Sequence, residues 1–245
     1  MHAATLVDLI GTDPVELMDR ETERIDRFYA GLDDAGWTAP TKCDEWNRRQ
    51  LLAHLAAIED YIRAGLDGSV AELFARSGAD GHHDFNDRGV RERIGLSPAD
   101  LLAEWRAAAA ENRRRLRERP LESTLDTSVG PYPFAAQAYY LASELAIHAD
   151  DAGVPVAPGE RADRTAWRSR FARVALAEAD RGVTVEDVPG RLLVGLDGEA
   201  AGVDDEDFVA ATAGRLRPEH PLPPKLRVPS RPTLFSRYWV RVFWR

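Results

Sequence analysis

The chain has 245 residues, which fits one large domain or one domain with a small appendage. Hydrophobic residues make up 44% and charged residues 30%, a composition that argues against a disordered or a membrane-spanning protein, and the formal net charge of −9 argues against a general nucleic-acid binder. Cys43 is the only cysteine, which excludes an internal disulfide and suits the reducing cytoplasm where we expect the protein.

The first two predicted helices have recognisable start signals. Asp13 followed by Pro14 supplies an N-cap and a first-turn proline, and we expect this helix to end near Gly31. Asn47 can cap a second helix, because Gln50 occupies the capping-box position three residues later. The apolar stripe that predicts the second helix consists of Leu51, Leu52, Leu55, Ile58 and Ile62.

Two more helices follow a long polar connection over residues 65–95, which has room for a short helix. The third predicted helix covers residues 98–119 and begins after the capping residue Ser97. The fourth covers residues 134–151 and ends before Gly153. Four helices with one long crossover predict an up-down or crossover four-helix bundle.

The sequence changes in character after Pro158. A helix over residues 167–179, a strand over 191–196 followed by a turn signal, and a helix over 204–216 predict a small α+β region. We therefore divide the chain into a bundle at residues 1–155, a small α+β region at 156–217, and a proline-rich linker with a basic aromatic tail at 218–245.

The last 13 residues, 233–245, are aromatic and basic. Five of them are aromatic, which makes full exposure to water unfavourable. As a helix, the segment would carry one broad apolar face and a second face with Arg237, Arg241 and Arg245. We expect it to dock on the protein's own acidic, apolar surface or across a homodimer. The alternative is a helix that lies on a membrane surface or binds another protein.

Glu144 and His148 are four residues apart, so a helix places both side chains on one face. Because the segment around them is apolar, a carboxylate there needs a pairing partner or a metal ion. His54, in an apolar helical run of its own, is the best candidate for a third ligand of a divalent ion. The alternative is an ordinary surface contact between Glu144 and His148, and the residues by themselves leave both interpretations open.

A resemblance to a known family supports the metal site. Residues 41–55, TKCDEWNRRQLLAHL, resemble a signature of the mycothiol-dependent maleylpyruvate isomerase family, T-x-C-x-x-W followed by a helix with an embedded histidine. The family's second signature, E-x-x-x-H-x-x-D, matches Glu144, His148 and Asp151, and residues 208–215 are similar to its C-terminal helix, which ends in Gly-Arg. The resemblance implies a mainly α, DinB-like four-helix bundle with a shortened α+β C-terminal region.

The resemblance also implies a chemistry. His54, Glu144 and His148 would be the protein ligands of a divalent metal, most often zinc, with a further position open to water or a thiolate. Mycothiol or a similar low-molecular-weight thiol would then attack a small electrophile, giving isomerisation or S-transfer. Asp151 would orient His148, and Arg215 would hold a substrate carboxylate. An ordinary helix-end acid and a solvated arginine are the alternatives for these two residues.

Two other groups carry reactive side chains. Cys43 precedes a helix, where a thiolate is favoured, although the family signature makes it a packed loop residue. Gly81-His82-His83-Asp84 could bind a metal, but an exposed polar loop is the more common explanation. The alternative function for the whole chain is a non-catalytic, metal-stabilised protein that binds or recruits a partner. A closed four-ligand metal site would favour that alternative, and an open coordination position would favour an enzyme.

Overall fold

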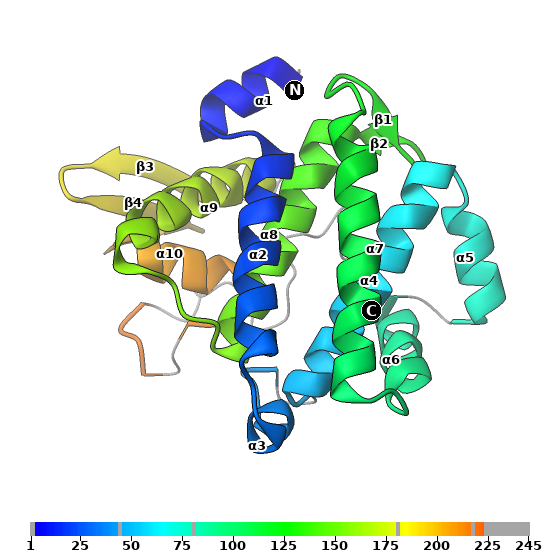
Figure 1. The fold of residues 1–245 in the computed structure, drawn as a ribbon. Coiled ribbons are helices and arrows are strands. Elements are labelled where there is room, and N and C mark those ends of the chain that lie inside the picture. Colours follow the sequence, from blue (N-terminus) through cyan, green and yellow to red (C-terminus); the bar gives the residue numbers. More distant parts are fainter. Residues whose placement is uncertain (1–2, 44–45, 80–81, 180–181, 217–218, 223–245) are drawn as a thin grey trace. The chain divides into compact units, whose positions relative to one another are not determined.

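The computed structural model describes residues 3–43, 46–79, 82–179, 182–216 and 219–222, and the chain forms two compact units (Figure 1). The first unit is Met1–Val156 and the second is Ala157–Arg245. The basic aromatic tail predicted at residues 233–245 lies outside the described residues, as does most of the proline-rich linker.

Four long helices make up the bundle of the first unit. They are α2 (Pro14–Ala30), α4 (Arg48–Asp67), α7 (Pro98–Arg117) and α8 (Phe134–Ala152). Helix α2 packs against α8 and α7, and α4 packs against α7 and α8 (Figure 1). The mainly α four-helix bundle predicted from the sequence is confirmed, and the ends of its helices differ from the predicted ones by a few residues at most.

The predicted start signals act as expected in the structure. The Asp13 carboxylate accepts hydrogen bonds from the second and third backbone N–H groups of α2, with Pro14 at its first position. Asn47 and Gln50 form a reciprocal capping box at the start of α4, with N–O distances of 3.0 and 2.9 Å. The Ser97 hydroxyl caps α7 in the same way. Each of these helices therefore begins where a side chain satisfies its first free N–H groups.

The connections of the first unit hold more structure than the sequence suggested. They contain α1 (Ala3–Ile10), α3 (Asp34–Thr38), α5 (Val70–Ser77), α6 (His82–Arg93), β1 (Thr124–Leu125) and β2 (Tyr132–Pro133). The polar stretch at 65–95, with room for one short helix in the prediction, forms both α5 and α6. Helix α6 was hard to see because it is strongly polar, and its described buried residues are few: Phe85, Asn86, Gly89, Val90 and Arg93.

The bundle core combines large apolar side chains with buried polar contacts, one of which joins α4 to α7. Trp105 of α7 and Tyr139 of α8 are fully buried. The Glu59 carboxylate of α4, also buried, accepts a 2.8 Å hydrogen bond from the amide of Asn112 and forms an ion pair with Arg113. Both partners belong to α7, so this buried polar contact fixes α4 against α7.

The second unit contains α9 (Pro158–Ala179), the antiparallel strands β3 (Thr184–Val188), β4 (Arg191–Leu196) and β5 (Glu199–Val203), and α10 (Asp205–Thr212). The predicted strand and turn are present: Asp197 and Gly198 join β4 to β5 with φ angles of 53° and 81°, as a tight two-residue hairpin turn requires. The prediction did not include strands β3 and β5, and it began α9 nine residues too late. The core of this unit is formed by Ala172, Leu176, Leu192, Val194, Val203, Phe208 and Leu222.

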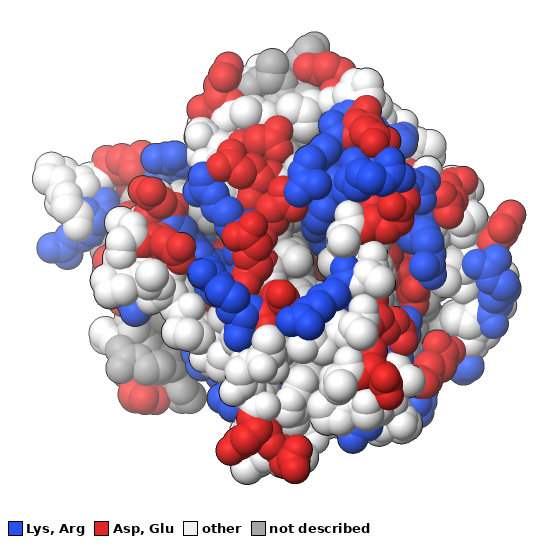
Figure 2. Space-filling view, viewed as in Figure 1, with Lys and Arg blue, Asp and Glu red and all other residues white. Residues whose placement is uncertain are grey.

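The outer faces of the bundle helices carry both signs of charge. Figure 2 shows acidic and basic side chains intermixed over the face that α2 and α7 form in Figure 1. Arg117 pairs with Asp19 at 2.6 Å and Arg106 pairs with Asp26, each joining α7 to α2. Exposed pairs of this kind contribute little to stability, so packing rather than charge holds these helices together. None of the described helices has both the length and the apolar character that a bilayer crossing requires.

Candidate metal centre

The three predicted ligands lie together inside the first unit. His54 projects from α4, whereas Glu144 and His148 lie one turn apart on α8. The Nε2 atoms of His54 and His148 lie 3.3 and 3.0 Å from the same carboxylate oxygen, Oε1 of Glu144. Both histidines are buried, with 2% and 3% of their surface exposed. Helix packing thus brings His54 to Glu144, which is 90 residues away in sequence, and places two imidazole nitrogens next to one carboxylate oxygen.

The spacing and chemistry of these atoms fit a divalent ion. Ligands about 2.1 Å from a tetrahedral zinc ion are roughly 3.4 Å from one another, close to both nitrogen–oxygen distances at Glu144. Among the described residues the group consists of these three donors, whose ligand atoms all lie within 4.8 Å of one another. Two histidines and a carboxylate with a further open position are a common donor set of catalytic zinc. Glu144 keeps 12% of its side chain exposed, so solvent reaches the group on that side.

The two histidines and Glu144 perturb one another's pKa values. Burial lowers the pKa of His54, more than its hydrogen bond to Glu144 raises it, so this ring is neutral. Burial raises the pKa of Glu144, but the charge of His148 and the hydrogen bonds from both histidines outweigh it and lower the pKa to about 2. For His148 burial lowers the pKa, yet the Glu144 charge and the hydrogen bond to Asp151 hold it well above its ordinary value. Without a metal, a proton on His148 therefore supplies the positive charge that Glu144 requires.

Asp151 lies behind His148, where the resemblance implies a positioning role. Its Oδ2 atom is 3.1 Å from Nδ1 of His148 and 3.1 Å from Sγ of Cys43, and the carboxylate is buried. The imidazole therefore donates its Nδ1 proton to Asp151 and directs Nε2 towards Glu144. Sγ of Cys43 lies 3.8 Å from Nδ1 of His148. The thiol thus contacts the carboxylate behind His148, on the far side of the ring from Glu144.

The neighbouring Trp46 contacts the other histidine. Its ring stacks on His54, with centroids 4.7 Å apart and an interplanar angle of 29°. The sequence singled out Trp46 only as a member of a family signature, and Cys43 also as a thiol before a helix, and it did not predict the contact of either residue. The available signal was that the T-x-C-x-x-W segment precedes the histidine helix directly, so its side chains can fold back over the first turns of α4.

The other candidate residues lie elsewhere. Arg215 follows α10 in the second unit, where its guanidinium donates to the carbonyl of Ala213 at 3.3 Å. Asp84 is on α6 and forms ion pairs with Arg88 and Arg91, at 2.8 and 3.3 Å. The segment predicted as an exposed loop around the two adjacent histidines thus starts a helix, and the side chains of those histidines lie outside the described part of the structure.

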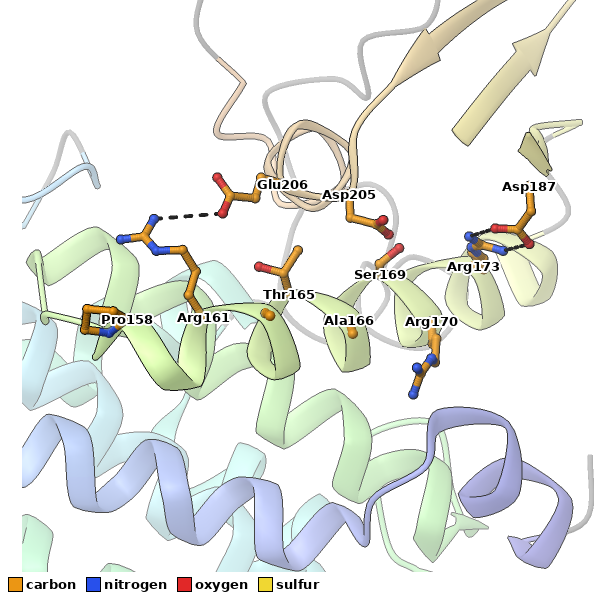
Figure 3. A pocket seen from close by; sticks show the side chains of 11 residues that line it. Pro158, Arg161, Thr165, Ala166, Ser169, Arg170, Arg173, Asp187, Asp205 and Glu206 are labelled. Carbon is orange, nitrogen blue, oxygen red and sulfur yellow. Dashed lines mark hydrogen bonds and ion pairs between the residues drawn. The ribbon is translucent and has the colours of Figure 1, made fainter. Parts of the chain in front are cut away.

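A cavity of about 580 Å³ lies within the second unit, between α9, the first turn of α10 and the strand residue Asp187 (Figure 3). Each end of this cavity holds an arginine that pairs with a carboxylate at the same end. Arg173 binds Asp187 with two hydrogen bonds of 2.8 and 2.7 Å, and Arg161 lies 3.9 Å from Glu206. Because its lining contains neither histidine nor cysteine, the cavity offers no donor set comparable to that of the bundle.

Comparison with known proteins identifies the family to which the chain belongs. Residues 18–153, more than half of the chain and including the whole donor set, match the family model described as "Mycothiol maleylpyruvate isomerase N-terminal domain". Two crystal structures of a mycothiol-dependent maleylpyruvate isomerase, one of them a histidine-to-alanine mutant, are similar to this chain with a TM-score of 0.59. Their sequences are 18% and 17% identical to it, over 82% of this chain and 88% of theirs. Curated protein sequences give no significant match. The chain belongs to the mycothiol maleylpyruvate isomerase N-terminal domain family.

Proposed function

We propose that this protein is a metal-dependent enzyme that uses mycothiol, or a similar low-molecular-weight thiol, to isomerise a small electrophile or to transfer the thiol to it. The observation that carries the proposal is the convergence of His54 and His148 on one oxygen of Glu144 inside the bundle. Membership of the family supports the thiol, since the structurally similar enzyme is described as mycothiol-dependent.

In this proposal His54, Glu144 and His148 bind the ion, and the chemistry of these donors suits zinc. A divalent ion bound to them would lower the pKa of a thiol and so supply a sulfur nucleophile at neutral pH. Asp151 accepts a hydrogen bond from Nδ1–H of His148 and thereby leaves Nε2 to act as the ligand. Glu144 keeps 12% of its side chain exposed, so the thiol and the electrophile would approach the ion from that side.

A catalytic metal fits the donor set better than a purely structural one. Structural zinc sites are closed by four protein ligands, whereas the group among the described residues has three. The resemblance of residues 208–215 to the family's C-terminal helix makes Arg215 the candidate for binding a carboxylate of the electrophile, which a guanidinium can hold through two parallel hydrogen bonds. Its role is tested by replacing it with lysine, which keeps the charge and removes the paired geometry.

The first experiment measures the metal content of protein purified without chelator, for the wild type and two variants. We expect about one zinc or similar ion per chain in the wild type and its loss in His148→Ala. His220→Ala is the matched control, since His220 is also a buried histidine paired with a carboxylate, Asp207 at 2.9 Å, but lies in the second unit. A folded, metal-free wild type, or equal loss in both variants, would contradict the proposed site.

Turnover separates the enzyme from the non-catalytic alternative. The metal-loaded protein is incubated with mycothiol and maleylpyruvate or related unsaturated acids, and product formation is followed with and without the thiol. Thiol-dependent turnover that disappears in His148→Ala supports the proposal. A protein that binds one ion tightly and turns over none of these electrophiles with any low-molecular-weight thiol supports a metal-stabilised binding protein instead.

A further inference from the structure

The two histidines of the metal centre are held in different ways. Metal-binding histidines usually donate their second ring N–H to a carboxylate, a carbonyl or water, which fixes the rotation of the ring. His148 follows this pattern, with Nδ1 at 3.1 Å from Asp151. His54 departs from it: within the described part of the chain its Nδ1 is buried and has no hydrogen-bond partner. Some other contact must orient the His54 ring.

Two neighbouring rings, Trp46 and His148, supply that restraint. The indole of Trp46 lies almost parallel to the imidazole, at 4.7 Å and 29°. The ring of His148 meets it nearly at right angles, at 4.8 Å and 78°. A rotation of His54 about its Cβ–Cγ bond would drive the ring into one of these neighbours, so packing limits the direction in which Nε2 can point. Stacking also stabilises an imidazole that becomes electron-poor when its nitrogen binds a cation.

The backbone around Trp46 is itself fixed, as a positioning role requires. The Thr41 hydroxyl donates to the Trp46 carbonyl at 2.7 Å, and the Trp46 N–H donates to the Cys43 carbonyl at 3.0 Å. Lys42 donates its backbone N–H to the carbonyl of Asp151 at 3.0 Å, which ties the same segment to the end of α8. Asn47, the next residue, is the capping residue of α4. The backbone that carries the indole is therefore held against α4 and α8, the two helices that carry the ligands.

We propose that Trp46 is a positioning residue for the metal centre, whose stacking on His54 replaces the hydrogen bond that the Nδ1 atom of this histidine lacks. The inference rests on the proposed metal site and assigns no contact between Trp46 and substrate. Trp46 and Asp151 then have equivalent tasks, one for each histidine, achieved by an aromatic face and by a carboxylate.

The test compares Trp46→Phe, which keeps an aromatic face, with Trp46→Leu, which keeps apolar volume without one. Zinc affinity is measured by competition with a chromophoric chelator, and the geometry of the centre by the visible absorption of the cobalt-substituted protein. We expect Trp46→Leu to bind zinc about 10- to 100-fold more weakly, the usual cost of losing a residue that orients a ligand, with altered cobalt bands. Trp46→Phe should recover most of the affinity and the wild-type spectrum.

Trp37→Leu controls for general loosening of the fold. Trp37 is a buried residue of α3, which precedes the loop that holds Trp46. Its ring packs on that of Tyr29, with centroids 5.2 Å apart, and does not contact either histidine ring. Circular dichroism of the metal-free variants verifies folding. Trp46→Leu with wild-type affinity and spectrum, or Trp37→Leu with an equal loss of zinc, would overturn the positioning role alone. A wild type that binds neither zinc nor cobalt would overturn the metal site as well.

Discussion

Oδ2 of Asp151 receives two donors at the same distance, Nδ1 of His148 and Sγ of Cys43, each 3.1 Å away. A thiol is a weak donor, so its contribution to this carboxylate is smaller than that of the imidazole. It still opposes rotation of the carboxylate away from His148. Cys43 is therefore better explained as a support for Asp151 than as a nucleophile, an interpretation that its substitution can test.

Replacing Cys43 separates these two roles. Cys43→Ser keeps a hydroxyl donor next to Asp151, and we expect zinc affinity within about threefold of the wild type and thiol-dependent turnover to persist. Cys43→Ala removes the donor, and we expect zinc affinity to fall by roughly three- to tenfold, less than for removal of Asp151 itself. Chelator competition measures both. A serine variant that binds zinc normally but has lost all turnover would instead make the sulfur itself catalytic.

At the scale of elements, the approach of α6 to α4 depends on a glycine. A Cβ atom added at Gly89 would lie 2.4 Å from the Cβ of Ala57 on α4, which is too close for two carbon atoms. Ala57 is one turn beyond His54, so α6 packs directly against the segment of α4 that carries a ligand. This contact explains how a glycine in the interior of a polar helix lets α6 approach α4 closely.

Helix propensity and packing make opposite predictions for Gly89→Ala. Propensity alone predicts a gain of about 1 kcal/mol, whereas the contact with Ala57 predicts a net loss of about 1–3 kcal/mol from overpacking. We expect the loss, measured as the free energy of unfolding in urea. Gly95→Ala is the matched control, since this exposed glycine has open space around its would-be Cβ and no positive φ. Stabilisation by both substitutions would show that α6 is not tightly packed on α4.

At the scale of the whole molecule, stability should depend on pH through the metal centre. In the metal-free protein the pKa of His148 is raised, so its contribution is complete below about pH 6.5, the ordinary histidine pKa, and is lost as the pH rises through the raised value. The pKa of Glu144 is lowered to about 2, so its contribution is present above about 4.5 and is lost as the pH falls towards 2.

We therefore expect the chelator-treated protein to lose stability on both sides of a maximum, in alkali through His148 and in acid through Glu144. With zinc bound, His148 is already deprotonated, so the alkaline loss should disappear. Urea unfolding at a series of pH values, with zinc or with chelator, measures both curves. Glu144→Gln should flatten the alkaline decline in chelator, because it removes the charge that raises the pKa of His148. An alkaline decline of the same size in that variant would mean that the dependence arises elsewhere.

The local sequence determined much of this protein. The caps at Asp13, Asn47 and Ser97 and the apolar stripes behind them predicted the bundle helices, because these signals act within a few residues of one another. The spacing of Glu144 and His148 predicted a shared helix face for the same reason. Polar elements such as α6, and the two strands beside β4, were missed because their burial depends on what packs against them.

The geometry of the site required the tertiary structure. Sequence reasoning proposed His54 as the third ligand, but only the packing of α4 against α8 determines how close its Nε2 lies to Glu144. The contact of Cys43 with Asp151 joins the loop before α4 to α8, and the stacking of Trp46 on His54 depends on how that loop folds back over α4. Helical periodicity fixes which side chains share a face, and it contains no information on which face of another helix they meet. That choice is made by burial of the whole core, to which residues throughout the unit contribute.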